Sequence, residues 1–513
     1  MVFNTPTFLI FMGICMAVYY ALPHRWQNPF LLAASYVCYM WAIPQYAVLI
    51  LFTTAFSFFA AKAIAAESGQ KKRRAVFVIG IIVPLVILFI FKYFNFFMGG
   101  VQSLFAVCGV VLEIPKLSWI LPLGISFYTF QVLGYTIDIY NRNTEPESNF
   151  VTYALFISFF PQVLAGPIGR ARELIPQYKC EHVFDYAKVS CGAQRFLTGL
   201  FKKIVLADGL AVIVDGVYGS LKDYLGFSLV IAVVLYALQL YFDFSGYSDM
   251  AIGSAQMLGF TLRENFAAPY FATDMSGFWK RWHMSLTSWF NDYIFTPLVW
   301  SRWVNKLIFG KKWDEHKPHF AANIIIVFAI SGLWHGAGLS FAVWGLLNGA
   351  YRVIEEMLHR IMPRKRRAEN RATIAAKRIL VFLLFAISLV FFRAASIADA
   401  VYVFKNMFTA VPFSVIIEQI RHLSSNGISI SGIYFMIFWG ILMISLVLGF
   451  ALDVRVNRSL AAKGAKAITN PVGTYGKKLR WAIYWFMGIS SMFFYFIGLT
   501  GQRGSGSFIY FGF

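Results

Sequence analysis

The sequence predicts an all-α polytopic membrane protein, from its composition, its apolar runs and the placement of its charges. Of its 513 residues, 59% are hydrophobic and 13% are charged, whereas a soluble domain has roughly 45–50% apolar and about 25% charged residues. The runs 75–91 and 433–452 approach or reach the ~20 residues that cross a hydrocarbon core. Basic residues lie in short blocks between such runs, at 71–74, 202–203, 363–371 and 477–480.

The net charge of +21 fits a membrane protein better than a nucleic-acid-binding protein. Basic loops stay on the cytoplasmic side of a membrane, and the blocks at 71–74 and 363–371 follow that rule. A nucleic-acid-binding chain would carry one continuous basic face in a known module, and none is visible in the sequence. We therefore expect membrane lipid, and no nucleic acid, as a partner.

Hydrophobic runs give the candidate helices of one domain over residues 1–513. We expect about eleven transmembrane helices around a core of shorter re-entrant helices, because several runs are short or broken by Pro or Gly. N-terminal helices are expected over 1–150, a catalytic core over 151–360 and C-terminal helices over 361–513. The candidate spans or half-spans lie near 7–23, 28–44, 46–66, 75–98, 119–140, 150–166, 204–219, 226–247, 320–334, 337–354, 378–394, 432–452 and 482–500.

The stretch 331–345 places His335 between glycines in an apolar segment. Both flanks, 302–319 and 351–367, are basic and are expected on the cytoplasmic side. The chain between them must enter and return, and about fifteen residues of helix reach about 22 Å deep. Glycines allow a break there, and an ionisable residue inside a membrane is a functional candidate by default. We predict a hairpin with His335 at its apex; the alternative is a core histidine bonded to a backbone carbonyl.

A second polar cluster lies in 278–298, where aromatic residues alternate with Lys280, Arg281 and His283. One interpretation is an interfacial amphipathic helix at the lipid headgroups. The other is functional: Lys280 and Arg281 attract the phosphates of an anionic donor, and His283 enters a buried site with His335. The pair of histidines beside a cationic entrance favours the second interpretation.

Two carboxylates, Asp243 and Asp249, lie in the apolar stretch 239–253. We expect them at a helix end or break and give them a structural role, because buried carboxylates cap turns or pair with arginine. A proton or ion path is the alternative.

No motif for a metal or a nucleotide is found in the sequence. The segment 313–319, with Asp314, Glu315, His316 and His319, fits no established ligand spacing, so a solvated loop is expected and no metal site is predicted. No GxGxxG strand–helix unit, GxxxxGK[ST], HExxH or GxSxG pattern is present. These absences disfavour a nucleotide-hydrolysing pump, a zincin and a serine hydrolase.

With both histidine stretches identified, the sequence resembles the membrane-bound O-acyltransferase family. More narrowly it is similar to the bacterial branch that contains the alginate O-acetyltransferase membrane subunit. The matching stretches run from the middle of the chain to its last residue, and in combination they are specific to this family. They are "SFFPQVLAGPI" (158–168), "RFLTGLFKKIVLAD" (195–208), "QLYFDFSGYSDMAIG" (239–253), "FWKRWHMSLTSWFNDYIFTPL" (278–298), "SGLWHGAGLSFAVWGLLNG" (331–349) and "FIYFGF" (508–513).

The resemblance implies a catalytic site that takes an acyl group from a cytoplasmic donor to an acceptor on the outer side. The family's invariant histidine falls on His335 and its second, less strictly kept position falls on His283. Acetyl-CoA is the expected co-substrate, with a carrier-protein thioester as the alternative, and no cofactor is expected. Contacts to donor or substrate are expected from Lys280, Arg281, Trp279, Trp282, Trp334, Ser331, Asn291 and Asp292.

The resemblance further implies a multi-pass protein of the bacterial inner membrane, in exopolysaccharide acetylation. An outer partner protein of the SGNH type and a polysaccharide are the expected acetyl acceptors. D-alanyl or other acyl transfer to teichoic acid or peptidoglycan is the alternative within the enzyme class. A transporter or flippase of an acylated lipid or sugar is the alternative outside it, although the paired repeats typical of transporters are not visible.

Overall fold

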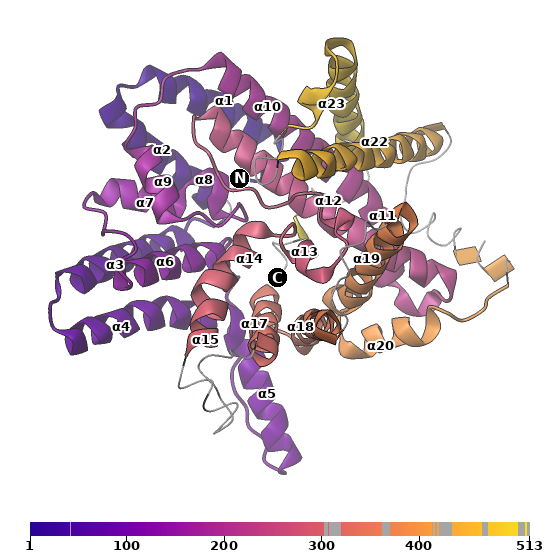
Figure 1. Ribbon diagram of the computed structural model, residues 1–513, viewed down its shortest axis with the longest axis horizontal. Coiled ribbons are helices and arrows are strands. Elements are labelled where there is room, and N and C mark those ends of the chain that lie inside the picture. The colour runs from indigo at the N-terminus through magenta and orange to yellow at the C-terminus, as the bar shows by residue number, and fades with distance from the viewer. Residues whose placement is uncertain are drawn as a thin grey trace. The chain divides into compact units, whose positions relative to one another are not determined.

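The computed structural model describes residues 1–41, 43–301, 306, 320–361, 370–412, 414–415, 418–419, 433–463, 470–500 and 508–509. Every regular element in these ranges is a helix (Figure 1). The all-α class is therefore confirmed for the described part of the chain. The segment 313–319 and residues 510–513 of the terminal motif lie outside the described residues.

Five helical stretches among the described residues are long and apolar enough to cross a membrane. They are Tyr46–Ala66, Gln70–Val107, Phe227–Met257, Arg371–Arg393 and Met436–Ala462. These stretches support a multi-pass membrane protein, but they do not confirm the expected number of about eleven spans. Which helices are re-entrant also stays a prediction.

The contacts between residues divide the chain into two compact units, and the single-domain expectation stays a prediction. The first unit comprises Met1–Ala193, Ala251–Arg263 and Gly336–Gly338. Its helices are α1 (Pro6–Ala21), α2 (His24–Met40), α3 (Tyr46–Ala66), α4 (Gln70–Leu88), the π-helical turn η1 (Phe89–Tyr93), α5 (Phe94–Val107), α6 (Ile125–Tyr140), α7 (Phe150–Ser158), α8 (Phe160–Val163), α9 (Ala171–Tyr178) and the first half of α10 (Tyr186–Phe201).

In the first unit, α3, α4 and α6 pack against one another and α2 packs on α7 (Figure 1). Tyr153 of α7 and Ser57 of α3 are fully buried, and their hydroxyls hydrogen-bond at 2.7 Å. A buried hydroxyl without a partner is destabilising. The packing of α7 on α3 in which these two hydroxyls bond is therefore favoured over packings in which they do not. The unit contains neither of the two candidate histidines.

The second unit comprises Gln194–Met250, Glu264–His335 and Leu339–Phe513, and it holds the candidate site. Its described elements begin with η2 (Lys202–Ala207), α11 (Asp208–Gly219), η3 (Leu221–Asp223), α12 (Phe227–Met257), η4 (Pro269–Phe271), α13 (Met275–Trp279), α14 (Met284–Phe290), η5 (Asn291–Phe295) and α15 (Thr296–Trp300). They continue with α17 (Phe320–His335), α18 (Leu339–Ile361), α19 (Arg371–Arg393), α20 (Ile397–Asn406), α22 (Ile433–Lys463), η7 (Val472–Thr474) and α23 (Lys477–Thr500).

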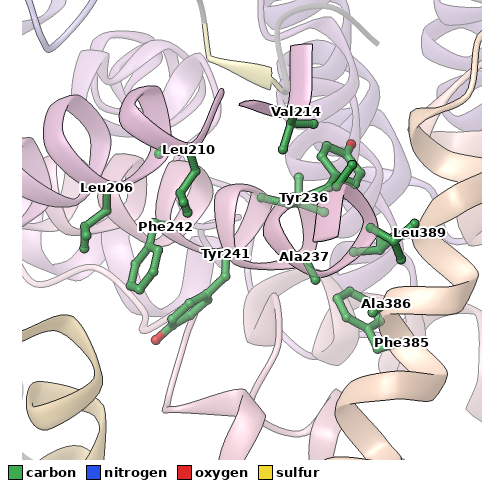
Figure 2. Packing of buried hydrophobic residues seen from close by; sticks show 14 of the residues in the cluster. Leu206, Leu210, Val214, Tyr236, Ala237, Tyr241, Phe242, Phe385, Ala386 and Leu389 are labelled. Carbon is green, nitrogen blue, oxygen red and sulfur yellow. The ribbon is translucent and has the colours of Figure 1, made fainter. Parts of the chain in front are cut away.

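The core of the second unit is built around α12. Figure 2 shows side chains of α12 between those of η2 and α11 on one side and those of α19 on the other. Burying a large apolar side chain is typically worth about 1.5–3 kcal/mol, and close packing leaves each helix little freedom to shift. The labelled residues are Leu206, Leu210, Val214, Tyr236, Ala237, Tyr241, Phe242, Phe385, Ala386 and Leu389.

A buried ion cluster centred on Lys203 joins η2, α11 and α12. The Lys203 side chain is 2% exposed, and its Nζ lies 2.8 Å from both Asp208 Oδ1 and Asp243 Oδ1. The Ile509 N–H donates to Asp243 Oδ2 at 3.0 Å, and the Phe508 ring lies 4.7 Å from Lys203 Nζ. The chain near its C-terminal end is thereby fastened to α12.

Replacing Lys203 by methionine should strongly destabilise the protein, because two carboxylates would lose their buried cation. Breaking a buried pair from one side typically costs about 3–5 kcal/mol. The matched control is Lys188→Met, since Lys188 is 64% exposed and lies 4.0 Å from Asp185, and exposed pairs are worth about 0–1 kcal/mol. Thermal unfolding in detergent measures both variants, and equal midpoints would contradict the structural role of the cluster.

Candidate active site

Two helices of the second unit, α17 and α18, form an antiparallel hairpin with glycines at their crossing. A Cβ at Gly332 would overlap the carbonyl oxygen of Phe341, and a Cβ at Gly345 would overlap that of Phe328. Only residues without a Cβ allow two helix backbones to approach this closely. The predicted helix break after His335 is confirmed, because α17 ends there and α18 begins at Leu339.

His335, the last residue of α17, is 5% exposed and is surrounded by aromatic rings. Its imidazole centroid lies 4.8 Å from Trp334, 5.1 Å from Trp344 and 5.4 Å from Phe392. All three rings meet the imidazole edge to face, the geometry that aromatic quadrupoles favour. These rings hold the imidazole orientation and keep its surroundings apolar.

His283 is held in an unusual backbone conformation between α13 and α14. Its φ of 44° and ψ of 53° are left-handed, a region that costs a non-glycine residue about 1–3 kcal/mol and recurs at functional sites. Two backbone hydrogen bonds hold the chain before and after His283: Ala267 N–H donates to Arg281 O at 3.0 Å, and Met284 N–H donates to Asn265 O at 2.9 Å. These bonds fix the position of the backbone that carries the imidazole.

The His283 side chain is 1% exposed and contacts rings from two helices. Its centroid lies 4.6 Å from Phe244 of α12 and 6.1 Å from Trp334 of α17. Burial lowers the pKa of the His283 imidazole from its ordinary 6.5 to about 3, because a low-dielectric surrounding disfavours the charged form. At physiological pH this ring is therefore neutral, with one nitrogen to donate and one to accept.

Trp334 connects the two histidines. Its ring contacts both imidazoles, at 4.8 Å from His335 and 6.1 Å from His283. Two stretches that are about fifty positions apart in the sequence thus meet within the second unit. The arrangement brings two imidazoles together among aromatic rings, which suits proton transfer in an apolar site.

Lys280 and Arg281, predicted together, lie in different surroundings. Lys280 is exposed and lines a cavity of about 400 Å³, whereas Arg281 donates from Nη1 to Asn457 Oδ1 at 2.8 Å. Arg281 is thus bonded to α22 rather than directed to the cavity. The other residues lining the cavity are Asp274, Ser276, Gly277, Arg352, Glu356 and His359.

Glu355 ties together the two elements that line this cavity. Its carboxylate accepts the N–H groups of Met275 at 2.7 Å and of Ser276 at 3.1 Å, and it pairs with Arg352. This carboxylate belongs to α18 and bonds the start of α13, so it holds together the two elements that line the cavity.

The remaining predicted contact residues divide into buried and exposed groups. Trp282 is 3% exposed and stacks on Phe278 at 5.6 Å, and Ser331 lies buried one turn before His335 in α17. Trp279 contacts Trp344 at 6.0 Å. Asn291 and Asp292 are exposed on η5, where the Asn291 Nδ2 lies 3.3 Å from Asp292 Oδ1.

The two carboxylates of α12 both lie in ion pairs. Asp249 accepts from Arg195 Nε at 3.1 Å and from Lys202 Nζ at 2.7 Å, and Asp243 pairs with Lys203. The expected helix end or break at these positions is wrong, because α12 continues from Phe227 to Met257. Pairing with a buried arginine is one of the alternatives that the sequence left open.

Several residues of the site were missed by sequence reasoning. Phe244, Phe392 and Trp344 line the imidazoles, and Arg352 and His359 line the cavity. Trp344 lies in the apolar first half of α18, where an aromatic residue at helical spacing resembles ordinary core packing. Phe392 is one of many aromatic residues in an apolar run, so no local signal marks it.

Comparison with known proteins identifies relatives over most of the chain. A model of the MBOAT, membrane-bound O-acyltransferase family, matches residues 37–396. A Pseudomonas aeruginosa protein named "Probable alginate O-acetylase AlgI" is 32% identical over 474 residues, which are 92% of this chain and 85% of that protein. A peptidoglycan O-acetyltransferase of Helicobacter pylori is 32% identical, over 79% of this chain and 80% of its own.

A teichoic acid D-alanyltransferase of Bacillus subtilis matches a smaller part. It is 29% identical over 239 residues, which are 44% of this chain and 56% of that protein. The range matched by the family model, by contrast, includes both candidate histidines and the whole α17–α18 hairpin.

The hairpin crossing can be tested with Gly332→Ala. The added methyl group has no room at the Phe341 carbonyl, so α17 and α18 must separate and the rings around His335 must shift. We expect a lower unfolding midpoint and a large loss of acyl-transfer activity. The control is Gly488→Ala in α23, where a Cβ meets nothing within 4 Å and helix propensity improves by up to about 1 kcal/mol. Equal activity in both variants would contradict the role of the crossing.

Proposed function

Since the chain belongs to the membrane-bound O-acyltransferase family, we propose that it moves an acetyl group from a cytoplasmic thioester donor to an extracytoplasmic polysaccharide or partner protein. Family membership makes the chain an O-acyltransferase and leaves the transporter alternative without support. The observation that carries the proposal is the buried imidazole of His335, held by aromatic rings at the end of α17.

Acetyl is the proposed acyl group because the relatives that cover most of the chain are named for O-acetylation. These are the alginate O-acetylase relative over 92% of the chain and the peptidoglycan O-acetyltransferase relative over 79%. D-alanyl transfer is the second candidate, supported by the teichoic acid relative over 44% of the chain. Acetyl-CoA is the proposed donor, and an outer protein of the SGNH type is a proposed acceptor, in the bacterial inner membrane.

His335 is proposed as the general base. The acceptor hydroxyl oxygen attacks the thioester carbonyl carbon and gives its proton to an imidazole nitrogen of His335. The tetrahedral intermediate then collapses, the C–S bond breaks and the leaving sulfur takes the proton from the imidazolium. A histidine with an ordinary pKa of about 6.5 can accept a proton at physiological pH, and no acyl-enzyme is required.

His283 is proposed to orient the reactants through its neutral ring. Because burial keeps the His283 pKa low, the ring does not compete with His335 for the proton near neutral pH. Its contact with Trp334, which also touches His335, supports this role. One of its nitrogens can then donate to the acceptor or to the acyl oxygen.

The cavity at Lys280 is proposed to hold the phosphates of the donor. Trp344, beside His335, and Arg352, at the cavity, are eight residues apart on α18, about 12 Å along a helix. In phosphopantetheine, twelve bonds join the phosphate oxygen to the sulfur. Fully extended, this chain is about as long as four residues of extended peptide, about 14 Å. A donor phosphate at the cavity can therefore present its thioester near His335.

Replacing His335 by alanine should remove most of the acyl transfer without unfolding the protein. General-base assistance is typically worth about 10²–10⁴-fold in rate. Release of the thiol from acetyl-CoA measures turnover in detergent, with a soluble uronate oligosaccharide as acceptor, and size-exclusion chromatography reports folding. His24→Ala in α2 is the histidine control and should behave as wild type. Wild-type turnover by folded His335→Ala protein would overturn the assignment.

Replacing Lys280 by alanine should raise the KM for acetyl-CoA and leave kcat nearly unchanged, because Lys280 attracts the donor and lies far from the reacting carbon. The effect should shrink as salt rises toward 1 M, where the Debye length falls to about 3 Å. Lys405→Ala in α20 makes the same change of charge on an exposed helix position and serves as the control. An equal KM in the two variants would remove Lys280 from the donor site.

A further inference from the structure

The indole N–H of Trp344 is buried beside His335 without an acceptor among the described residues. The Trp344 side chain is 2% exposed, and its Nε1 has no hydrogen-bond partner in the described part of the chain. Its ring lies 5.1 Å from the His335 imidazole, with the two planes at 84°. The indole ring that carries this donor therefore packs directly on the imidazole of the candidate base.

A buried indole N–H without a hydrogen-bond acceptor is energetically unfavourable and needs an explanation. Leaving a buried N–H unbonded costs about 1–3 kcal/mol, and such groups are rare in native proteins. A phenylalanine could supply apolar contacts to His335 and Phe392 without that cost. A donor that meets a reacting carbonyl, however, would gain its bond only when substrate is present.

We propose that Trp344 is a further catalytic residue, whose indole N–H donates a hydrogen bond to the carbonyl oxygen of the transferred acyl group. The inference rests on the proposed function, with His335 as the base. As the acceptor oxygen bonds to the carbonyl carbon, the carbonyl π electrons move to the oxygen, and the N–H stabilises the negative charge. When the C–S bond breaks, the electrons return and the thiol leaves with the proton held by His335.

The surroundings of Trp344 fix the direction of its indole in advance. Phe392 packs against the ring at 5.2 Å, and Trp279 packs at 6.0 Å. One turn later in α18, the buried Asn348 donates from Nδ2 to the backbone carbonyl oxygen of Trp344 at 2.8 Å, which holds the main chain that carries the indole. Donors that need no reorganisation are the most effective at stabilising an oxyanion, because the protein has already oriented them during folding.

Trp344 is favoured over Trp279 as the oxyanion donor. The Trp279 Nε1 is also buried without a partner among the described residues, but the Trp279 ring packs on Trp344 at 6.0 Å, and it is Trp344 that packs on His335. We assign the carbonyl contact to Trp344 and leave Trp279 as a neighbour that orients it.

Replacing the indole of Trp344 by benzothiophene tests the hydrogen bond without changing the ring's size. Site-specific incorporation of benzothienylalanine at position 344 exchanges the N–H for sulfur. We expect kcat for acetyl transfer from acetyl-CoA to fall about 10²-fold, with the KM for acetyl-CoA unchanged. The unfolding midpoint should be at or above the wild-type value, because the unbonded buried N–H is removed. Trp344→Phe should show the same kcat loss with a lower midpoint, because it also removes part of the ring. Benzothienylalanine at Trp439, whose ring packs on Phe438 in α22, should leave kcat at the wild-type value.

Wild-type kcat with benzothienylalanine at position 344 would overturn the inference. A parallel loss of kcat and midpoint in that variant would also overturn it, since a merely structural role predicts both. The two proposals can fail separately. If His335→Ala is inactive while the analogue at position 344 is fully active, His335 remains the proposed base and Trp344 is not the oxyanion donor. If folded His335→Ala retains activity, the proposed function itself fails.

Discussion

The close crossing of α17 and α18 is the constraint on which the rest of the site depends. Gly332 and Gly345 let each backbone touch a carbonyl of the other helix, and Gly332 lies in the last turn of α17. His335 stands at that end, and Trp344 faces it from the returning helix. A side chain at either glycine would move His335 and the neighbouring indole together, so the geometry of the proposed catalytic site depends on the packing of two backbones.

The candidate site has an apolar part around the two imidazoles and a polar part at the cavity, which we propose as the reaction centre and the donor region. The two imidazoles are packed by aromatic rings of α12, α17, α18 and α19. In such a low-dielectric setting an oriented donor or base acts more strongly than in water. Charged residues of both signs gather instead around the cavity at the far part of α18, and Lys280 and Arg352 are the cations among them. We propose that these two cations receive the anionic phosphates of a donor whose thioester is uncharged.

The sequence predicted those parts of the fold that depend on local pattern. The basic flanks of one apolar stretch predicted the α17–α18 hairpin, and glycines next to His335 predicted the break in it. Other features depend on contacts between distant segments. His283 adopts a left-handed conformation because residues 265 and 267 brace it, and α12 continues past Asp249 because Arg195 and Lys202 neutralise that carboxylate. A single sequence does not reveal such neighbours.

The most direct test is a structure of the protein with a thioether analogue of acetyl-CoA that cannot transfer its acyl group. We expect the phosphates at Lys280 and the acyl carbonyl between His335 and Trp344, with its oxygen at hydrogen-bonding distance from the Trp344 Nε1. An acyl group bound more than one helical turn from the His335 imidazole would contradict the roles of both residues.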